Sequence, residues 1–259
     1  MAQAEFPHSA SQDALVKDAP SALPGWTLGV SAANAPTRAG AVGRETSFRP
    51  VFAGQLGRWM VSTSSALSLN PDGVAGGVST KLSESGKWST GLGVRLTQGR
   101  SADGDPLLEG MPRIRASAAA RVSARYAITP VWSGMAQWQQ DLLHAQGGRA
   151  NVGLTARWPL GNGWMLNTGA GVSWLNRQAM QTFYGVPEEA AQTGRSAYRA
   201  TAGLEQWSAS VGALWAVDRH WRVSSGWSTS RLAGAAAASP LTVRRGGNSL
   251  QLTVAYVGW

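Results

Sequence analysis

The most regular feature of the chain is an alternation of apolar residues with polar or small ones, at a period of two. Between residues 207 and 230, one set of alternating positions carries mainly Trp, Val and Ala, while the other carries mainly Ser, Gly and Arg. Residues 218–220 interrupt the pattern. Because successive side chains of a β-strand point to opposite sides, this stretch predicts two antiparallel strands, each with one apolar face.

The same alternation recurs along the chain and predicts about twelve strands. They cover residues 26–32, 48–56, 59–65, 74–82, 88–97, 113–126, 131–140, 151–158, 164–174, 207–217, 221–230 and 249–259. The connections after the first, fifth, ninth and eleventh strands are long, and short turns lie between them. Long loops at one end, short turns at the other and an even strand number are typical of barrels in bacterial outer membranes.

Tryptophans lie on the apolar faces, near the ends of the predicted strands. Trp207 and Trp215 are eight residues apart, and Trp164 and Trp174 are ten. At about 3.3 Å per residue and a tilt of about 45°, these spacings span roughly 19 to 23 Å of membrane. Tryptophan favours the membrane–water interface. We therefore predict an all-β fold, a transmembrane antiparallel β-barrel, with an aromatic girdle formed by Trp26, Trp88, Trp132, Trp138, Trp158, Trp164, Trp174, Trp207, Trp215, Trp221 and Trp227.

Composition narrows the class of protein. Charged residues make up 14% of the chain, which is low for a soluble domain, and no apolar run approaches the roughly 20 residues of a membrane helix. The absence of Cys excludes disulfides, zinc–thiolate sites and thiol catalysis. The net charge of +9 raises the question of nucleic-acid binding. That function requires basic and aromatic side chains on one surface, whereas here they fall on opposite faces, so we expect no nucleic-acid partner.

The basic residues of the predicted strands share the inward face. They are Lys81, Arg95, Arg113, Arg115, Arg121, Arg125, Arg157 and Arg222. Hardly any carboxylate within a strand opposes them, which leaves two interpretations. Either they bond to backbone, water and inward-folded loop acids and fill a narrow interior, or they line an anion-favouring lumen, since rings of Arg or Lys select anions. Arginines near the outer end have a third use, which is to hold lipopolysaccharide phosphates.

The two ends of the chain suggest how it reaches the membrane. Residues 1–25 are expected to form a flexible periplasmic tail, and residues 26–259 a single barrel. The start shows neither a basic segment nor an apolar core of a signal peptide, so we expect a mature chain with Met1 added, or one cut at the Ala2-Gln3-Ala4 triplet. Tyr256 and the final Trp259 resemble the terminal signal by which the barrel-assembly machinery recognises its substrates.

No catalytic set emerges from the sequence. A lipid-modifying barrel enzyme would need a histidine beside a nucleophile, but His8 lies in the tail and His220 in a predicted turn. His144, in a loop, has no Ser two residues on. One loop carries three acidic residues, Asp103, Asp105 and Glu109. We interpret them as solvated or as meeting divalent ions near lipopolysaccharide, and we predict a non-enzymatic protein without a cofactor or metal site.

The last third of the chain carries more specific motifs. They are Phe183-Tyr184-Gly185-Val186, Ala190-Ala191, Thr193-Gly194, Tyr198, Ser230-Arg231-Leu232-Ala233-Gly234 and Ser239-Pro240-Leu241, with Leu108-Glu109-Gly110-Met111 upstream. In these residues the chain resembles the MltA-interacting protein family, also called the OmpV family. It departs from the family at Ala235 to Ala238, where acidic residues usually stand, and in the position of Tyr256.

The resemblance implies a protein of the Gram-negative outer membrane in contact with outer-membrane lipid and lipopolysaccharide. For the family's namesake it implies a scaffold that joins a periplasmic lytic transglycosylase to a murein synthase. We therefore expect a scaffold for murein enzymes, with a narrow anion-favouring channel or small-solute porin as the alternative. Family membership does not decide between them.

Overall fold

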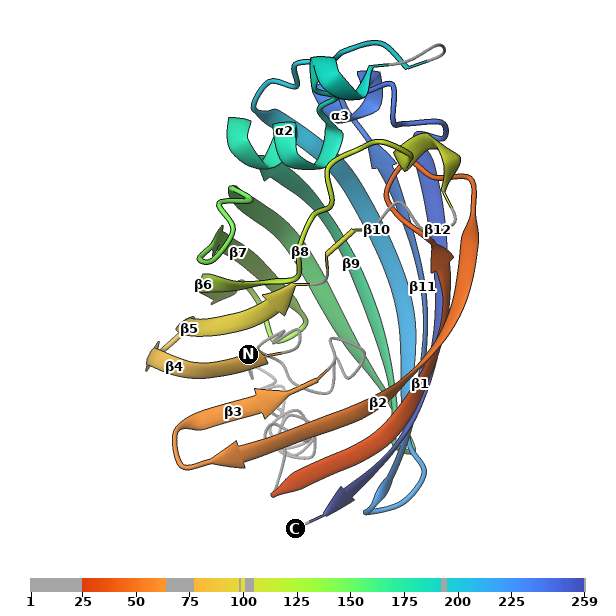
Figure 1. The fold of residues 1–259 in the computed structure, drawn as a ribbon. Coiled ribbons are helices and arrows are strands. Elements are labelled where there is room, and N and C mark those ends of the chain that lie inside the picture. Colours follow the sequence, from red (N-terminus) through yellow and green to blue (C-terminus); the bar gives the residue numbers. More distant parts are fainter. Residues whose placement is uncertain (1–24, 64–76, 98, 101–104, 192–194, 259) are drawn as a thin grey trace, which may run out of the picture.

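The computed structural model describes residues 25–63, 77–97, 99–100, 105–191 and 195–258. Residues 1–24 of the predicted tail and the terminal Trp259 lie outside these ranges. In sequence order, each strand pairs antiparallel with the next, and the first closes on the last, so the strands form one closed barrel (Figure 1). The prediction of a twelve-stranded antiparallel barrel is confirmed.

The strands differ in length around the barrel. They are β1 Trp26–Pro36, β2 Arg44–Leu56, β3 Trp59–Ser62, β4 Gly77–Ser85, β5 Trp88–Thr97, β6 Ser117–Ala127, β7 Trp132–Asp141, β8 Gly148–Gly161, β9 Trp164–Leu175, β10 Gly203–Ala216, β11 Trp221–Leu232 and β12 Gly246–Gly258. The helical elements are the 3-10 helices η1 Pro106–Leu108 and η2 Glu188–Ala190 and the α-helices α2 Arg177–Tyr184 and α3 Gly234–Ala238. Of the described helices, none is both long and apolar enough to cross a membrane.

The structure corrects the sixth predicted strand. The alternation suggested a start at Arg113, but β6 begins at Ser117. Ile114, expected to face lipid, instead forms an isolated bridge with Arg100 and is 7% exposed. An extended loop segment alternates just as a strand does, so the sequence pattern cannot mark where the barrel wall ends. The segment between β9 and β10, predicted to be irregular, contains α2 and η2.

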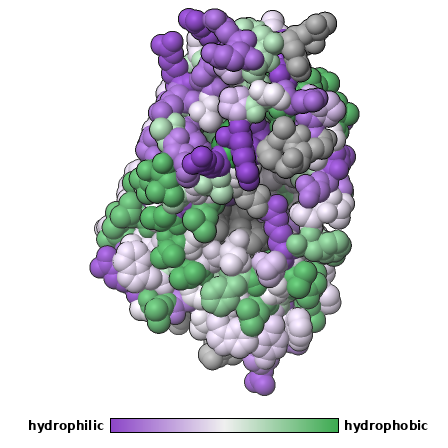
Figure 2. Space-filling view, in the orientation of Figure 1, coloured by the Kyte–Doolittle hydropathy of each residue, from purple (hydrophilic) through white to green (hydrophobic). Residues whose placement is uncertain are grey.

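The two faces of the barrel wall differ as the alternation predicted. Outward side chains such as Val30, Leu96 and Leu252 are apolar and exposed. Inward ones such as Thr27 and Thr253 are polar and buried. Hydrophilic residues gather over the loop-bearing end, and apolar residues cover much of the sides (Figure 2). This arrangement reverses that of a water-soluble protein and suits a lipid environment, where each backbone polar group must be paired within the wall.

One part of the interior wall, formed by β9 to β12 and β1, is built mainly from Gly, Ser, Ala and Thr. These small residues let neighbouring groups approach closely. A Cβ added to Gly29 would lie 2.3 Å from the Val254 carbonyl oxygen, inside any allowed contact. The Thr253 hydroxyl lies 3.1 Å from the Ser31 hydroxyl. This part of the wall therefore leaves space inside the barrel.

The long loops gather at one end of the barrel, termed the outer end because outer-membrane barrels place their long loops outside. There α2, α3, η1 and η2 form a compact cap above the ends of the longer strands (Figure 1). The cap has its own apolar core, which includes Met180, Tyr184, Leu232 and Ala236. The cap is thus a packed element that covers part of the outer mouth.

Candidate functional site

The candidate site is the basic side of the barrel interior, on β5 to β8. The register places Gly93 opposite Arg121 and Ala119 opposite Arg95, so each arginine has a small neighbour on the adjoining strand. On β8, Arg157 also occupies a position whose side chain points into the barrel, as Arg95 and Arg121 do. Arg149 also points inward, although the predicted strand began at Asn151 and so left it out. The sequence did contain a signal for its direction: Arg149 lies two residues before the inward Asn151, so alternation points both side chains the same way.

Arg95 and Arg121 carry the least compensated charge of this set. Arg121 is 6% exposed, and within the described residues Nε of Arg95 has no hydrogen-bond partner. Arg95 lies close enough to both Arg121 and Arg149 for their charges to repel. Like charges held together in a partly dry interior produce a positive potential that attracts anions.

A carboxylate on β10, two strands away from β8, compensates Arg149. Glu205 is 2% exposed, and its Oε1 accepts hydrogen bonds from Arg149 at 3.0 Å and from the Tyr184 hydroxyl at 2.9 Å. Burial and the Glu205 charge raise the pKa of the Tyr184 hydroxyl above its usual range, so this hydroxyl remains a donor. Glu205 sits where the register shifts between Leu204 and Gln206. Its sequence parity matches that of outward residues, so alternation alone could not have found it.

The remaining predicted basic residues lie towards the opposite, periplasmic end. Arg125 donates to the Ser133 hydroxyl at 2.9 Å. Arg222 donates to the backbone carbonyls of Trp221 and Asp218. Lys81 forms an exposed ion pair with Glu84 at 3.1 Å. These three are tied to neighbours at the edge of the lumen.

Two predicted inward residues lie outside the lumen. Arg113 and Arg115 precede β6 and are exposed in the loop between β5 and β6. They line a pocket beside α2 at the outer end. The prediction that they belong to the inner face of a strand is wrong, because the barrel wall stops at Ser117.

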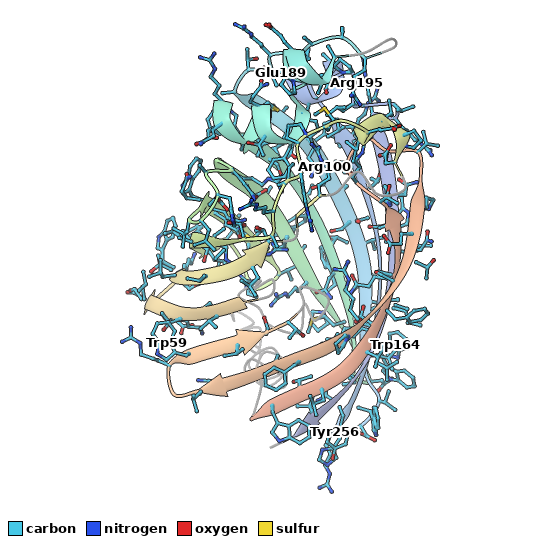
Figure 3. All side chains as sticks on the ribbon, in the orientation of Figure 1. Trp59, Arg100, Trp164, Glu189, Arg195 and Tyr256 are labelled. Atoms are coloured by element: carbon cyan, nitrogen blue, oxygen red, sulfur yellow. The ribbon has the colours of Figure 1, made fainter. Side chains whose placement is uncertain are left out.

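The predicted tryptophans all lie on the outer face, with exposures between 36 and 56%. Several pair with aromatic residues on adjacent strands, such as Trp164 with Trp215, whose rings stack at 5.3 Å. Tyr256 lies among Trp26 and Trp221 near the periplasmic end (Figure 3). Trp59, absent from the predicted girdle, is exposed in the same zone (Figure 3). These rings lie where the interface zones of a membrane barrel are found.

A closed twelve-stranded barrel with an apolar exterior, exposed aromatic rings and a polar interior defines an outer-membrane barrel protein. The model of one family, described as MltA-interacting protein MipA, matches residues 28–258. The chain therefore belongs to the MltA-interacting protein family.

Solved outer-membrane barrels are similar to this chain at low sequence identity. The NanC porin matches with a TM-score of 0.50 and 8% identity, covering 88% of this chain and 98% of its own. An outer-membrane channel from Pseudomonas putida F1 matches with a TM-score of 0.46 and 15% identity, covering 92% of this chain and 97% of its own. A comparison with curated proteins gives no match. At 8% identity, the likeness to the NanC porin shows the fold alone.

Several of the described residues that carried the family resemblance meet in the cap, whereas Thr193 and Gly194 lie outside the described ranges. The Ser239 hydroxyl donates to the Tyr184 carbonyl at 2.6 Å, and the Tyr198 hydroxyl donates to the Ala235 carbonyl at 2.9 Å. Leu241 packs in a second small core with Leu108 and Val186. The motifs therefore describe how the outer loops pack together.

The cap also depends on Arg195, which no pattern in the sequence singled out. Arg195 is 2% exposed and donates to the carbonyls of Leu107 at 2.6 Å, Glu109 at 2.8 Å and Ala190 at 2.6 Å. It thereby joins the β5–β6 loop to the β9–β10 loop near η2 (Figure 3).

Proposed function

We propose that this protein is an outer-membrane channel whose basic interior favours small anionic solutes. The observation that supports it is the charge on β5 to β8. Their inward cationic residues are Arg95, Arg121, Arg125, Arg149 and Arg157. The inward carboxylate on these strands is Asp141, which accepts backbone hydrogen bonds from His144 and Gln146 at the end of β7.

The geometry favours selectivity over high flux. The interior of a twelve-stranded barrel is narrow, and long arginine side chains occupy part of it. A passing anion would exchange water for guanidinium contacts, whereas a cation would be repelled by the positive charges of Arg95 and Arg121. The cap further restricts the outer mouth, which makes small solutes the expected cargo.

Conductance in planar bilayers tests this function. Under a KCl gradient, the purified barrel should show a reversal potential that favours chloride. In the double variant Arg95→Gln/Arg121→Gln, the ratio of chloride to potassium permeability should fall several-fold towards one. The reversal potential should therefore move towards zero. Arg231→Gln is the matched control, because Arg231 is exposed and shares the outward parity of Trp227 on β11, and it should change nothing. A folded but silent barrel, or an unchanged reversal potential in the double variant, contradicts the proposal.

A scaffold for murein enzymes is the second candidate. The family description names a protein that interacts with MltA, and the short turns would offer the periplasmic contact surface. The turn at Asp218 is ordered, because its carboxylate accepts the backbone N–H of His220 at 2.7 Å and of Trp221 at 2.8 Å. Immobilised barrel should retain a purified lytic transglycosylase and a murein synthase, while an unrelated barrel of similar size should not. Equal retention by both barrels, or by neither, removes this candidate.

A further inference from the structure

A second basic site lies at the outer end, apart from the lumen arginines. It is a pocket of about 850 Å³ between α2, the segment 111–115 and the loop residues 144–146. Arg100 forms part of its lining and lies beneath α2 (Figure 3). The volume falls within the range of about 300 to 1,000 Å³ typical of small-molecule sites.

Four arginines line this pocket: Arg100, Arg113, Arg115 and Arg177. Among the described lining residues there is no Asp or Glu, and none of the four arginines pairs with a described carboxylate. The nearby Asp105 is already bonded to Arg38 at 2.7 Å. The pocket therefore has positive charge without a counterion from the described chain.

Arg100 is the most enclosed of the four. Its guanidinium donates to the Phe183 carbonyl at 2.8 Å. Burial, together with the charge of Arg38, lowers the pKa of Arg100 to about 10, which still leaves it charged at neutral pH. An anion in the pocket would relieve this unfavourable environment.

The walls that carry these charges are fixed in place. The backbones of Arg100 and Ile114 exchange two hydrogen bonds, at 2.8 and 2.9 Å. The side chain of Gln146 donates to the Arg115 carbonyl at 2.6 Å. On the opposite wall, the first turn of α2 is capped by Asn176, whose side chain accepts from the Ala179 N–H at 2.8 Å. A preformed site avoids part of the entropic cost of ordering its groups on binding.

The other lining groups suit a hydroxyl-rich ligand. Gln178 and Thr182 on α2 contribute amide and hydroxyl groups, while Met111, Ile114 and Pro187 contribute apolar surface. We propose that the pocket binds a saccharide that carries phosphate, with the arginines on the anionic group and α2 facing the sugar. The ligand is either a soluble sugar phosphate or the phosphorylated sugar of lipopolysaccharide. Binding does not require the barrel to conduct, so this proposal stands apart from the channel.

Calorimetry on the full chain in detergent tests the soluble source. Glucose 6-phosphate is the probe and glucose the neutral control, which should bind far more weakly. Arg113→Gln/Arg115→Gln should weaken binding of the probe at least tenfold, because two charge-assisted contacts are lost. Both residues are exposed, so the variant should fold, which heat-dependent gel mobility checks. Arg244→Gln removes an exposed cap arginine outside the pocket and should leave binding unchanged.

The lipid source is tested with nanodiscs that contain phosphatidylcholine with or without lipid A, using radiolabelled glucose 6-phosphate. Competition by lipid A that disappears in Arg113→Gln/Arg115→Gln would identify lipopolysaccharide phosphate as the ligand. Probe binding without such competition would identify a soluble ligand. If neither probe binds, or if Arg244→Gln weakens binding as much as the pocket variant does, the site is overturned.

Discussion

Five inward arginines lie on β5 to β8, whereas β9 to β12 and β1 present mainly Ser, Gly, Ala and Thr, apart from Arg222 at the periplasmic edge and Glu205 at the outer one. The two sides of the interior thus divide two tasks. One supplies charge on long side chains, and the other supplies the space that these side chains need. A narrow barrel with arginines on every strand would be overpacked and would repel itself.

The largest effect is expected where the small-residue side is filled. Gly29→Ala should lower the free energy of unfolding by about 3 kcal/mol, because the new methyl group would overlap the Val254 carbonyl. Urea unfolding in detergent, followed by tryptophan fluorescence, measures it. Gly226→Ala is the matched control, since its nearest neighbour atom would be 3.9 Å away. Equal effects of both substitutions would show that the close approach of neighbouring backbone atoms is not the reason why this side of the barrel needs small residues.

The next effect concerns the carboxylate that links the two sides. Glu205→Gln should cost about 2 kcal/mol, because it leaves Arg149 without its ion pair. The Arg149 side chain is partly exposed, which keeps the cost below that of a fully buried pair. The same unfolding experiment on Glu188→Gln, in the exposed pair with Arg199, should show less than about 0.5 kcal/mol. Similar losses in both variants would argue against a special role for Glu205.

Tyr184, which also contacts Glu205, predicts a pH dependence. Its pKa is raised in the folded protein, so the folded state keeps a proton that the unfolded state releases above about pH 10. Stability from this group is complete below that pH and declines above it, by at most about 1.4 kcal/mol per pH unit. Unfolding titrations between pH 9 and 11 should show a shallower decline for Tyr184→Phe than for the unmodified protein. Parallel curves would contradict this assignment.

The smallest effect should appear on the outer surface, where the two sides do not differ. Trp164 and Trp215 stack at 5.3 Å with an interplanar angle of 5°. A double-mutant cycle with alanine should give a coupling of about 1 kcal/mol. The pair Trp138 and Trp174, at 6.4 Å and 37°, is the comparison and should couple less. If the stacked pair shows no coupling, contact between the rings does not contribute to stability, and the girdle tryptophans depend on contact with lipid alone.

The sequence predicted what depends on alternation and missed what depends on its interruption. The inward direction of Arg121 followed from period two, because that part of β6 is regular. Arg113 and Arg115 were misplaced because an extended loop alternates like a strand. Glu205 was missed because a register shift reverses its direction. The cap could be recognised from its motifs, but its packing could not, because its contacts join residues far apart in the chain.

The contacts of Arg195 have a consequence for how the molecule is recognised from outside. This one side chain holds carbonyls at positions 107, 109 and 190 together. Segments more than 80 residues apart therefore present one continuous surface. We therefore expect an antibody against the folded outer end to recognise a discontinuous epitope, which is lost when the cap unfolds and which no single loop peptide reproduces.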